Sequence, residues 1–460
     1  MHLYPKIFKA YDIRGIYPNE IDELGIAQLT KAVYTFFTTT LQKQPLTVGI
    51  GRDMRLSSPV LYASLLRTLT QMGAQVVDLG LVSTPSFYFA VWHYKYDCGM
   101  QVTASHNPKE YNGLKFVINT PKGLIKIGKT TGMDEVKALA LSESIDHPTG
   151  TGELVTQNQT VLSDEVDNAL TMFNHPKIHS FKIVADPANA MGATYLEALA
   201  QKLPITLVKM NFALDGNFPA HPPDPLDYNN LVDLQNKVVE QKADFGLAPD
   251  GDGDRLFFVD EKGSVVPATV ITAIIAKTLL MTHPQEKIYF DIRYIFTPQS
   301  VIAEFGGKPV ITKVGHAYIT QQMHSQGGIF AGESSGHYFF KATGNAESQV
   351  TVIVCILDVL TKEHLTLSEL VAKYQRSFES GEINFTVSNA KDIIESAKKR
   401  FHDGEISELD GVAITYPSWR FSLRMSNTEP LLRLNIEGKN SAIMEEKKKE
   451  LLSFIAEHKR

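Results

Sequence analysis

Short apolar segments alternate with amphipathic segments along most of the chain. Residues 46–51 are apolar and end in glycine, which predicts a strand followed by a turn. A helical pattern follows Ser57, and residues 74–79 predict the next strand. Similar strand-like segments lie at 182–186 and 287–291. Because strand, turn, helix and strand alternate, the pattern predicts α/β domains with mixed, largely parallel sheets.

The C-terminal part has a different pattern. The chain has 460 residues, too many for one compact core. From Thr366 onward the composition becomes more charged, and the last twenty residues predict an amphipathic, lysine-rich helix. We therefore expect three successive α/β domains and a smaller α+β C-terminal domain. The expected boundaries are 1–150, 151–262, 263–370 and 371–460.

Composition and charge narrow the possible partners. The formal net charge is −6, so no domain-sized basic surface for nucleic acid is expected, and local Arg and Lys must bind any anionic ligand. Cys98 and Cys355 lie in apolar segments, which predicts two buried, reduced thiols. The N-terminus lacks the apolar core of a signal peptide, and the apolar stretch 265–281 is shorter than the roughly 20 residues that span a bilayer. We expect a cytoplasmic protein without membrane or nucleic-acid partners, and a buried or amphipathic helix at 265–281.

A first polar motif, residues 103–108, directly follows the strand-like segment 98–102 and contains Ser105, His106 and Asn107. A serine at this position lies on a constrained loop, where we expect its hydroxyl to be exposed. Serine acts as a nucleophile only beside a base or in a charge-stabilising environment. The motif alone leaves open an Asx-type turn in which these side chains bond only to the backbone.

A second motif places three aspartates, alternating with glycines, just before Arg255; they are Asp250, Asp252 and Asp254. An extended backbone would direct all three carboxylates to one side. Crowded carboxylates favour a bound cation, and oxygen ligands suit Mg²⁺. Arg255 adds a fixed positive charge for a phosphate. The spacing to Glu261 matches an EF-hand loop, but Arg255 stands where that loop needs glycine and a strand follows, so only a plain acidic loop remains as the alternative.

Two later loops carry side chains suited to a sugar and to a phosphate. Glu333 and Ser335 lie on a short, glycine-flanked loop and can bind neighbouring sugar hydroxyls. Arg424 begins a loop of small polar residues, namely Ser426, Asn427 and Thr428. A guanidinium combined with such side chains and with backbone N–H groups forms a phosphate site. Each of these loops, taken alone, is also compatible with an ordinary turn.

In this order and at these separations, the four motifs resemble those of the α-D-phosphohexomutase family, most of all the phosphomannomutase/phosphoglucomutase subgroup. The resemblance covers almost the whole chain, from Phe-Lys-Ala-Tyr-Asp-Ile-Arg-Gly at 8–15 through 51–53 and 313–316 to 424–433. It implies three α/β domains and a smaller α+β C-terminal domain around a central cleft. It also implies interconversion of hexose 1-phosphate and hexose 6-phosphate, of mannose, glucose or both, through phosphoserine and a bisphosphorylated sugar.

The resemblance further implies roles for individual residues. The residues implied in phosphoryl transfer are Ser105, Arg14, His106 and Lys115, with Lys115 and His106 left open as the general acid/base. One Mg²⁺ per chain is implied, bound by Ser105 as phosphoserine, Asp250, Asp252 and Asp254. The implied substrate-binding residues are Arg255, Arg293, His316, Glu333, Ser335, His337, Arg424, Ser426, Asn427 and Thr428. A hexose 1,6-bisphosphate is expected as activator and intermediate, a small-molecule sugar phosphate as partner, and a monomer or weak homo-oligomer as the assembly.

The chain departs from the family pattern in two places. Residues 344–348 read Gly-Asn-Ala-Glu-Ser where relatives usually carry an acidic-acidic-glycine cluster, which bears on sugar preference. Arg293 stands where relatives often have Lys, and the two do not bind phosphate or hydroxyls in the same way. Two alternatives remain at this point: a phosphoglucosamine mutase with the same chemistry, and a catalytically silent sugar-phosphate-binding protein.

Overall fold

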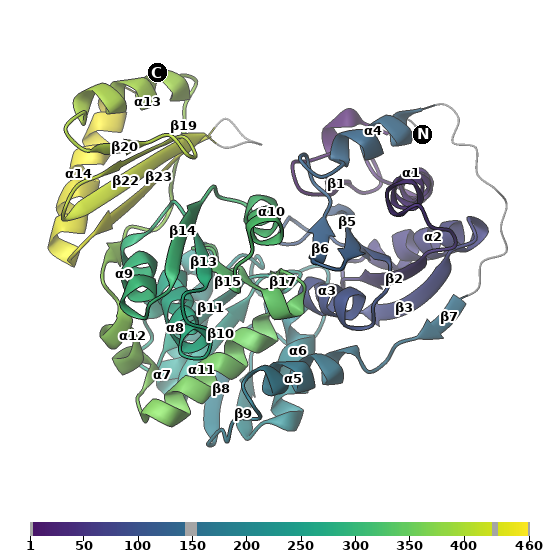
Figure 1. The fold of residues 1–460 in the computed structure, drawn as a ribbon, viewed down its shortest axis with the longest axis horizontal. Helices are drawn as coiled ribbons and strands as arrows, with labels where there is room; N and C mark the ends of the chain where they lie inside the picture. Colours follow the sequence, from purple (N-terminus) through teal and green to yellow (C-terminus); the bar gives the residue numbers. More distant parts are fainter. Residues whose placement is uncertain (1–2, 143–153, 426–430, 459–460) are drawn as a thin grey trace. The chain divides into compact units, whose positions relative to one another are not determined.

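A computed structural model describes residues 3–142, 154–425 and 431–458. The chain forms two compact units, and Figure 1 shows the ribbon with its elements labelled. Unit 1 comprises residues 1–265 and 336–368, and unit 2 comprises residues 266–335 and 369–460. Three α/β parts with mixed sheets and a smaller C-terminal part follow one another along the chain, which confirms the predicted fold class. The four predicted domain boundaries stay predictions.

The N-terminal part of unit 1 is built on a sheet of strand order β1-β5-β4-β2-β3-β7, with β6 paired to β5. Its elements are β1 (Ile13–Ile16), α1 (Glu23–Leu41), β2 (Thr47–Arg52), α2 (Ser58–Gln71), β3 (Gln75–Leu81), α3 (Thr84–His93), β4 (Cys98–Val102), β5 (Tyr111–Thr120), β6 (Gly123–Lys126), α4 (Met133–Leu141) and β7 (Leu154–Gln157). Strand β2 runs parallel to β3 and β4, whereas β5 is antiparallel to β4 and β1. The carboxyl ends of β2, β3 and β4 therefore meet at one edge of the sheet, where the polar loops lie.

The second part of unit 1 has the strand order β12-β11-β10-β8-β9. Its elements are α5 (Val161–Met172), β8 (Phe181–Ala185), α6 (Gly192–Lys202), β9 (Ile205–Lys209), α7 (Val232–Gln241), β10 (Phe245–Pro249), β11 (Leu256–Asp260) and β12 (Val265–Val266). The unit also contains β16 (Tyr338–Phe340), β17 (Ala346–Glu347) and α11 (Gln349–Glu363), and α11 packs against α5 and α6. Strand β10 is parallel to β8 and antiparallel to β11, so the loop between β10 and β11 is a tight reversal.

Unit 2 begins with α8 (Ala268–Leu280), β13 (Lys287–Asp291), α9 (Phe296–Glu304), β14 (Lys308–Thr312), α10 (His316–Gln326) and β15 (Phe330–Gly332). Strand β13 lies between β14 and β15 and is parallel to both. The predicted helix at 265–281 is confirmed, and it begins after Pro267, which has no N–H to donate and is tolerated at a helix start. Among the described residues, no helix is long and apolar enough to span a bilayer.

The C-terminal part of unit 2 is an antiparallel sheet of order β18-β23-β22-β21-β20, with β19 paired to β23. Its elements are α12 (Leu367–Tyr374, which begins in unit 1), β18 (Phe378–Glu379), β19 (Ile383–Thr386), α13 (Ala390–Arg400), β20 (Glu405–Ser407), β21 (Val412–Thr415), β22 (Trp419–Met425), β23 (Leu431–Gly438) and α14 (Ser441–His458). Helices α13 and α14 pack on this sheet (Figure 1), and their apolar residues join its core. The predicted C-terminal helix is thus confirmed, and Cys98 and Cys355 are free and buried as predicted.

Candidate functional site

Ser105 lies three residues after β4, on a loop that Arg55 holds in place. The Arg55 guanidinium donates to the backbone carbonyls of Ser105 at 2.7 Å and Asn107 at 2.6 Å, and it pairs with Asp53. Ser105 has a φ of 52°, in the left-handed region, and is only 3% exposed. The prediction of an exposed hydroxyl is therefore wrong. The aspartate loop packs directly over the serine, because a Cβ on Gly251 would lie 2.4 Å from the Ser105 carbonyl oxygen.

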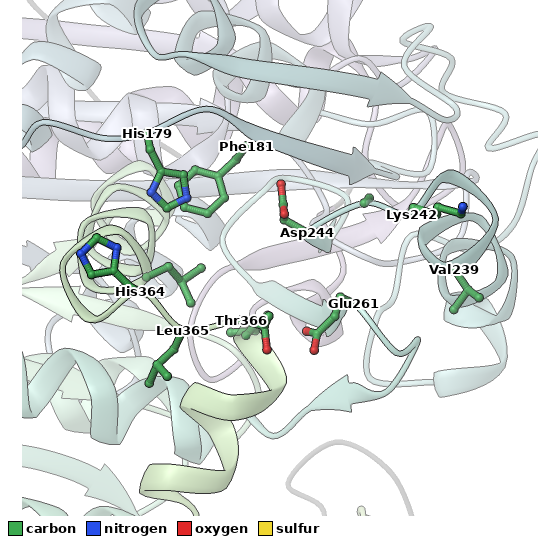
Figure 2. A pocket seen from close by; sticks show the side chains of 12 residues that line it. His179, Phe181, Val239, Lys242, Asp244, Glu261, His364, Leu365 and Thr366 are labelled. Carbon is green, nitrogen blue, oxygen red and sulfur yellow. The ribbon is translucent and has the colours of Figure 1, made fainter.

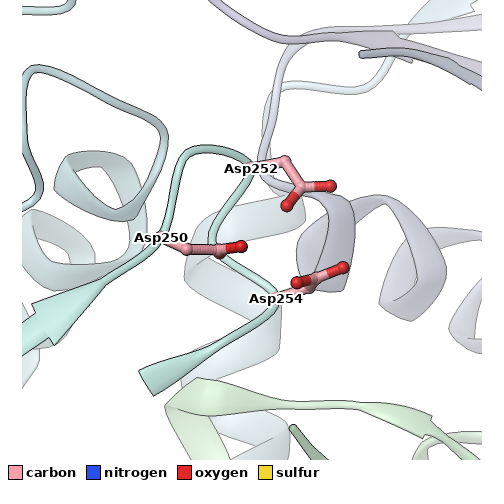
Figure 3. Close-up of side chains that lie close together, drawn as sticks. All are labelled: Asp250, Asp252 and Asp254. Carbon is pink, nitrogen blue, oxygen red and sulfur yellow. The ribbon is translucent and has the colours of Figure 1, made fainter. Parts of the chain in front are cut away.

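Asp250, Asp252 and Asp254 gather their carboxylates at one point in unit 1 (Figure 3). All three are buried, and one oxygen of each lies within 4.8 Å of the others. The predicted extended backbone is wrong, because residues 251 and 252 form a turn. The Gly253 N–H donates to the Asp250 carbonyl at 3.1 Å, and Gly253 has a φ of 79°, which favours glycine. A turn, rather than the alternation of a strand, brings the carboxylates together.

The serine loop and the aspartate loop form one site. Ser105 Oγ lies 3.4 Å from Asp250 Oδ2 and 3.2 Å from His106 Nδ1. Both loops belong to unit 1, so their proximity is a property of that unit alone. A phosphoryl group on Ser105 would therefore carry its oxygens beside three carboxylates, which requires positive charge close by.

Lys115 supplies part of that positive charge. Its Nζ lies 2.6 Å from Asp252 Oδ2 and 2.7 Å from Asp254 Oδ2. Burial lowers the pKa of the Lys115 ammonium, but the charges of Asp252 and Asp254 outweigh burial and hold that pKa well above its ordinary value. His337 Nε2 lies 3.1 Å from Asp254 Oδ1. Burial raises the pKa of Asp254, but Lys115 and then His337 outweigh it, so this carboxyl has a pKa well below its usual range.

The aspartate cluster has the properties of a metal site. Burial, followed by the charges of Asp254 and Asp252, raises the pKa of Asp250 well above its usual range. Asp252 Oδ1 is buried and has no hydrogen-bond partner among the described residues. A divalent cation would satisfy that oxygen and relieve the repulsion between the carboxylates. The donor set therefore fits a hard metal ion.

Arg14, Arg255 and His106 also lie in unit 1, around the serine loop. Arg14 Nε donates to Asp12 at 2.8 Å, and its guanidinium also bonds to the Asn107 side chain. The backbone N–H of Arg255 donates to Asp250 Oδ1 at 3.1 Å. Burial, then Arg255 and Arg14, lowers the pKa of His106 well below its ordinary value. His106 is thus a neutral and weakly basic imidazole.

The second group of predicted residues lies in unit 2, at the carboxyl ends of β13 and β15. Arg293 makes a bidentate pair with Asp291, with Nε and Nη2 each 2.9 Å from a carboxylate oxygen. Its Nη2 also donates to Ser335 Oγ at 3.2 Å. Glu333 accepts the Gly315 N–H at 2.7 Å, just before the first residue of α10, His316. The structure therefore gathers the predicted sugar-binding residues of unit 2 at one edge of a parallel sheet.

Arg424 lies near the end of β22 and pairs with Glu382 at 2.9 Å. The loop residues Ser426, Asn427 and Thr428 lie outside the described residues. Arg424 is 8% exposed and Glu382 is more open, at 23% for its side chain. Glu382 was not among the residues that the sequence suggested.

Several further residues of the site escaped the sequence analysis. Thr84, the first residue of α3, donates its hydroxyl to Asp252 Oδ2 at 2.7 Å. Arg55 follows the recognised Gly-Arg-Asp segment at 51–53, and Asp291 ends β13, so both stand at strand ends where a search for polar residues would have found them. Thr84 also follows a strand, but threonine is too common at helix starts to be distinctive. No feature of the sequence around Glu382 indicates that it is a functional residue.

The segment that departs from the family pattern lies next to the aspartate loop. Glu347 forms a buried ion pair with Lys126. Gln349, the first residue of α11, donates its side-chain N–H to the backbone carbonyl of Asp254. Gln349, directly after the departing segment, thus supports the aspartate loop.

Unit 1 also contains a cavity of about 620 Å³ that includes none of the predicted site residues (Figure 2). It lies between the end of α11 and the end of α7. The imidazole of His179 stacks on Phe181 at its rim, with the ring centroids 4.1 Å apart. Glu261 also lines the cavity, but its carboxylate is occupied by the backbone N–H and the hydroxyl of Ser368. The cavity is separate from the site described above.

Comparison with protein families assigns the chain in four consecutive parts. The models are described as phosphoglucomutase/phosphomannomutase α/β/α domains I, II and III and the C-terminal domain of the same family. They match residues 5–131, 163–263, 268–377 and 382–453, respectively.

Individual relatives are similar over their whole length. The phosphomannomutase of Vibrio cholerae serotype O1 is 36% identical over 458 residues, which cover 97% of this chain and 98% of the relative. The phosphomannomutase of Methanocaldococcus jannaschii is 37% identical, with coverages of 98% and 97%. A crystal structure of a phosphoglucomutase/phosphomannomutase family protein from Burkholderia thailandensis has a TM-score of 0.85 at 28% identity, covering 98% of this chain and 97% of that one.

Proposed function

Because the chain belongs to the phosphoglucomutase/phosphomannomutase family and is a phosphohexose mutase, an intramolecular phosphotransferase, we propose the following route for its reaction. Phosphorylated Ser105 donates its phosphoryl group to a free hydroxyl of a mannose or glucose monophosphate. The resulting hexose 1,6-bisphosphate reverses its orientation, and its other phosphate returns to Ser105. Hexose 1-phosphate and hexose 6-phosphate are thereby interconverted.

One observation carries this proposal: Ser105 Oγ lies 3.4 Å from a carboxylate of the buried aspartate cluster. In each transfer the P–O bond to one oxygen breaks while the P–O bond to the other forms, and the attacking hydroxyl loses its proton. The main catalytic need is to neutralise the charge on the phosphoryl oxygens. A serine beside a cation site meets that need.

We assign one Mg²⁺ per chain to Asp250, Asp252, Asp254 and an oxygen of phosphorylated Ser105. Mg²⁺ prefers few protein carboxylates combined with phosphate oxygens. The unpartnered Asp252 Oδ1 and the raised pKa of Asp250 support this assignment. When bound, Mg²⁺ supplies charge neutralisation for the transferred phosphoryl group.

Lys115 and His106 are the two candidates for general acid/base. Lys115 is charged, because Asp252 and Asp254 outweigh its burial and raise its pKa; as a general acid it would donate its proton only once a cation at these carboxylates lowers that pKa. His106 Nδ1 lies 3.2 Å from Ser105 Oγ, within reach of the reacting oxygen, although the lowered pKa of the imidazole makes it a weak base. Arg14 contacts the serine loop through Asn107, and the Arg255 guanidinium lies 3.9 Å from Asp250 Oδ2, so both add positive charge there. Both residues therefore remain candidates for moving the proton, on the ground of their position beside the reacting groups.

The remaining predicted residues are assigned to the substrate. Arg293, His316, Glu333 and Ser335 recognise the sugar, and the hydrogen bond between Arg293 and Ser335 supports a common role. Arg424, Ser426, Asn427 and Thr428 receive the phosphate that is not being transferred. Arg255 and His337 act from the side of the aspartate cluster. Both orientations of the intermediate present a phosphate and hydroxyls to these groups.

The test combines mass spectrometry and a coupled assay. Phosphopeptide mapping of the purified chain should find phosphate on Ser105, and the enzyme should convert mannose 1-phosphate, glucose 1-phosphate or both. A preference for glucosamine 1-phosphate would instead identify a phosphoglucosamine mutase, and sugar-phosphate binding without turnover would refute the proposed reaction. A cytoplasmic location and a monomeric or weakly oligomeric state remain predictions from the sequence.

A further inference from the structure

Three arginines of unit 2 converge on a single carboxylate. Glu382 Oε2 lies 2.9 Å from Arg424 Nη2 and 4.0 Å from Arg293 Nη1, and Glu382 Oε1 lies 3.3 Å from Arg433 Nη1. The four residues come from separate places in the chain: the end of β13, the residue before β19, and the strands β22 and β23. Glu382 therefore joins the sugar-binding side of unit 2 to the strand that leads into the predicted phosphate loop.

The sheet register places two arginines opposite each other, and a carboxylate beside them reduces their repulsion. Arg424 and Arg433 are direct partners in the antiparallel pair β22–β23. Like charges at directly opposite positions destabilise a sheet and push the two side chains apart. On the other side of β23, Asn384 of β19 is the partner of Arg433, and Glu382 stands two residues earlier. Glu382 thus lies where a negative charge can hold both arginines.

The charge balance of the cluster suits a phosphate. The three guanidinium groups face two carboxylates, Glu382 and the Asp291 that pairs with Arg293, so the cluster keeps one net positive charge that attracts a phosphate. A guanidinium has five N–H donors, so the pair with Glu382 leaves Arg424 with donors for a ligand. The Glu382 and Arg433 side chains are 23% and 25% exposed, so the cluster is open to solvent on one side. Burial raises the pKa of Glu382, but Arg293, Arg424 and Arg433 outweigh burial and lower it, so the carboxylate stays charged.

We propose that Glu382 is a positioning residue for phosphate recognition, which holds Arg424 and Arg433 together as a pair that receives the substrate phosphate beside the sugar-binding Arg293. The inference rests on the proposed role of Arg424 in phosphate binding. Glu382 acts through the arginines and does not touch the substrate. Without Glu382, the like charges of Arg424 and Arg433, which lie opposite each other in the sheet, repel each other. The guanidinium groups then lose their common orientation.

The test compares Glu382→Gln, Glu382→Asp and Glu408→Gln in the full chain. Glu408 pairs with Lys398 on the surface of the same unit and serves as the control. Inorganic phosphate is the probe, and its Kd is measured by calorimetry alongside KM and kcat for the preferred hexose phosphate. Glu382→Gln should raise the phosphate Kd about tenfold and raise KM more than kcat falls. Glu382→Asp, which keeps the charge, should recover part of the affinity, and the control should match the wild type.

A double-mutant cycle localises the effect and guards against a loss of folding. Arg424→Gln should also weaken phosphate binding, and adding Glu382→Gln to it should cost much less than Glu382→Gln alone. An unchanged phosphate Kd in Glu382→Gln would overturn the inference, because Glu382 would then have no role in phosphate binding. A lower Kd would also overturn it, because Glu382 would then compete with phosphate for the arginines. If Glu382→Gln does not fold, Glu382→Asp takes its place in the test. Its phosphate Kd should then be higher than that of the wild type, and an unchanged Kd would overturn the inference. If the wild type did not turn over hexose phosphates but the phosphate Kd still rose in Glu382→Gln, the proposed function would be refuted and this inference would stand.

Discussion

The hydroxyl oxygen of Ser105 lies 3.4 Å from Oδ2 of Asp250, although 145 positions separate the two residues in the chain. Two motifs that suggested different chemistry, a nucleophile and a cation site, are thereby parts of a single site. The contact lies within unit 1, where the loop after β4 meets the reversal between β10 and β11. A substitution in one motif should therefore affect the chemistry assigned to the other motif.

Ser105→Ala removes the oxygen that carries the phosphoryl group. We expect turnover to fall by at least about 10³-fold, because a nucleophile that forms a covalent intermediate has no substitute. Sugar-phosphate binding should persist, since the predicted substrate residues are elsewhere. A coupled assay and calorimetry measure the two quantities, and Ser325→Ala, on the exposed face of α10, is the control. Turnover near the wild-type rate would remove Ser105 from the mechanism.

Chelation of divalent metal should destabilise the wild type through the aspartate cluster. A ligand at about 100 times its Kd stabilises a protein by about 2.7 kcal/mol, so EDTA should lower Tm measurably. Asp250→Asn should weaken metal binding. In EDTA the variant should melt no lower than the wild type, because it removes a charge that burial and the neighbouring carboxylates disfavour. Thermal scans with and without EDTA measure the Tm of both proteins. An equal decrease in Tm on addition of EDTA to both proteins would argue against a metal at Asp250.

Thr84→Val tests how the aspartate cluster is held. The substitution keeps the shape of the side chain but removes the hydroxyl that bonds to Asp252 Oδ2. Loss of a partner that orients a metal ligand typically costs 10–100-fold in metal affinity, so we expect a Kd for Mg²⁺ at least about tenfold higher. Titration calorimetry measures the change. Thr171→Val, an exposed position on α5, should bind the metal like the wild type; the prediction is lost if Thr84→Val does so as well.

Glu165→Gln tests the cost of a buried carboxyl on α5. Burial raises the pKa of Glu165 to about 7, although Ser86 donates to its carboxylate at 2.6 Å. Because the folded pKa lies above the unfolded value of about 4.3, the contribution of Glu165 to stability is lost as pH rises from about 4.3 to about 7. The stability of the variant relative to the wild type should therefore increase over this range and then level off.

Urea denaturation of both proteins at several pH values measures this difference, which the size of the pKa shift limits to roughly 3–4 kcal/mol. The exposed substitution Glu135→Gln on α4 controls for the loss of a charge. A difference between Glu165→Gln and wild type that does not change with pH would show that folding does not raise the pKa of Glu165.

The local elements of this protein follow from its sequence. The strand predicted at 98–102 is β4 with the same bounds, and the helix predicted within 265–281 starts directly after Pro267. Such elements depend on the apolar period and on the special backbone properties of proline and glycine, which neighbouring residues determine. The four motifs likewise identified the family, since residue types in a fixed order are visible without coordinates.

The tertiary structure alone decided how the side chains meet. The aspartates converge through a turn at Gly253 rather than through an extended backbone, and the same loop covers Ser105, whose hydroxyl the sequence suggested would be exposed. Thr84 and Glu382 entered the site only through the strand order and register that bring distant segments together. Local patterns determine which element forms because their energetics are short-range. Contacts across a sheet or between loops depend on the packing of the whole unit, which no short segment encodes.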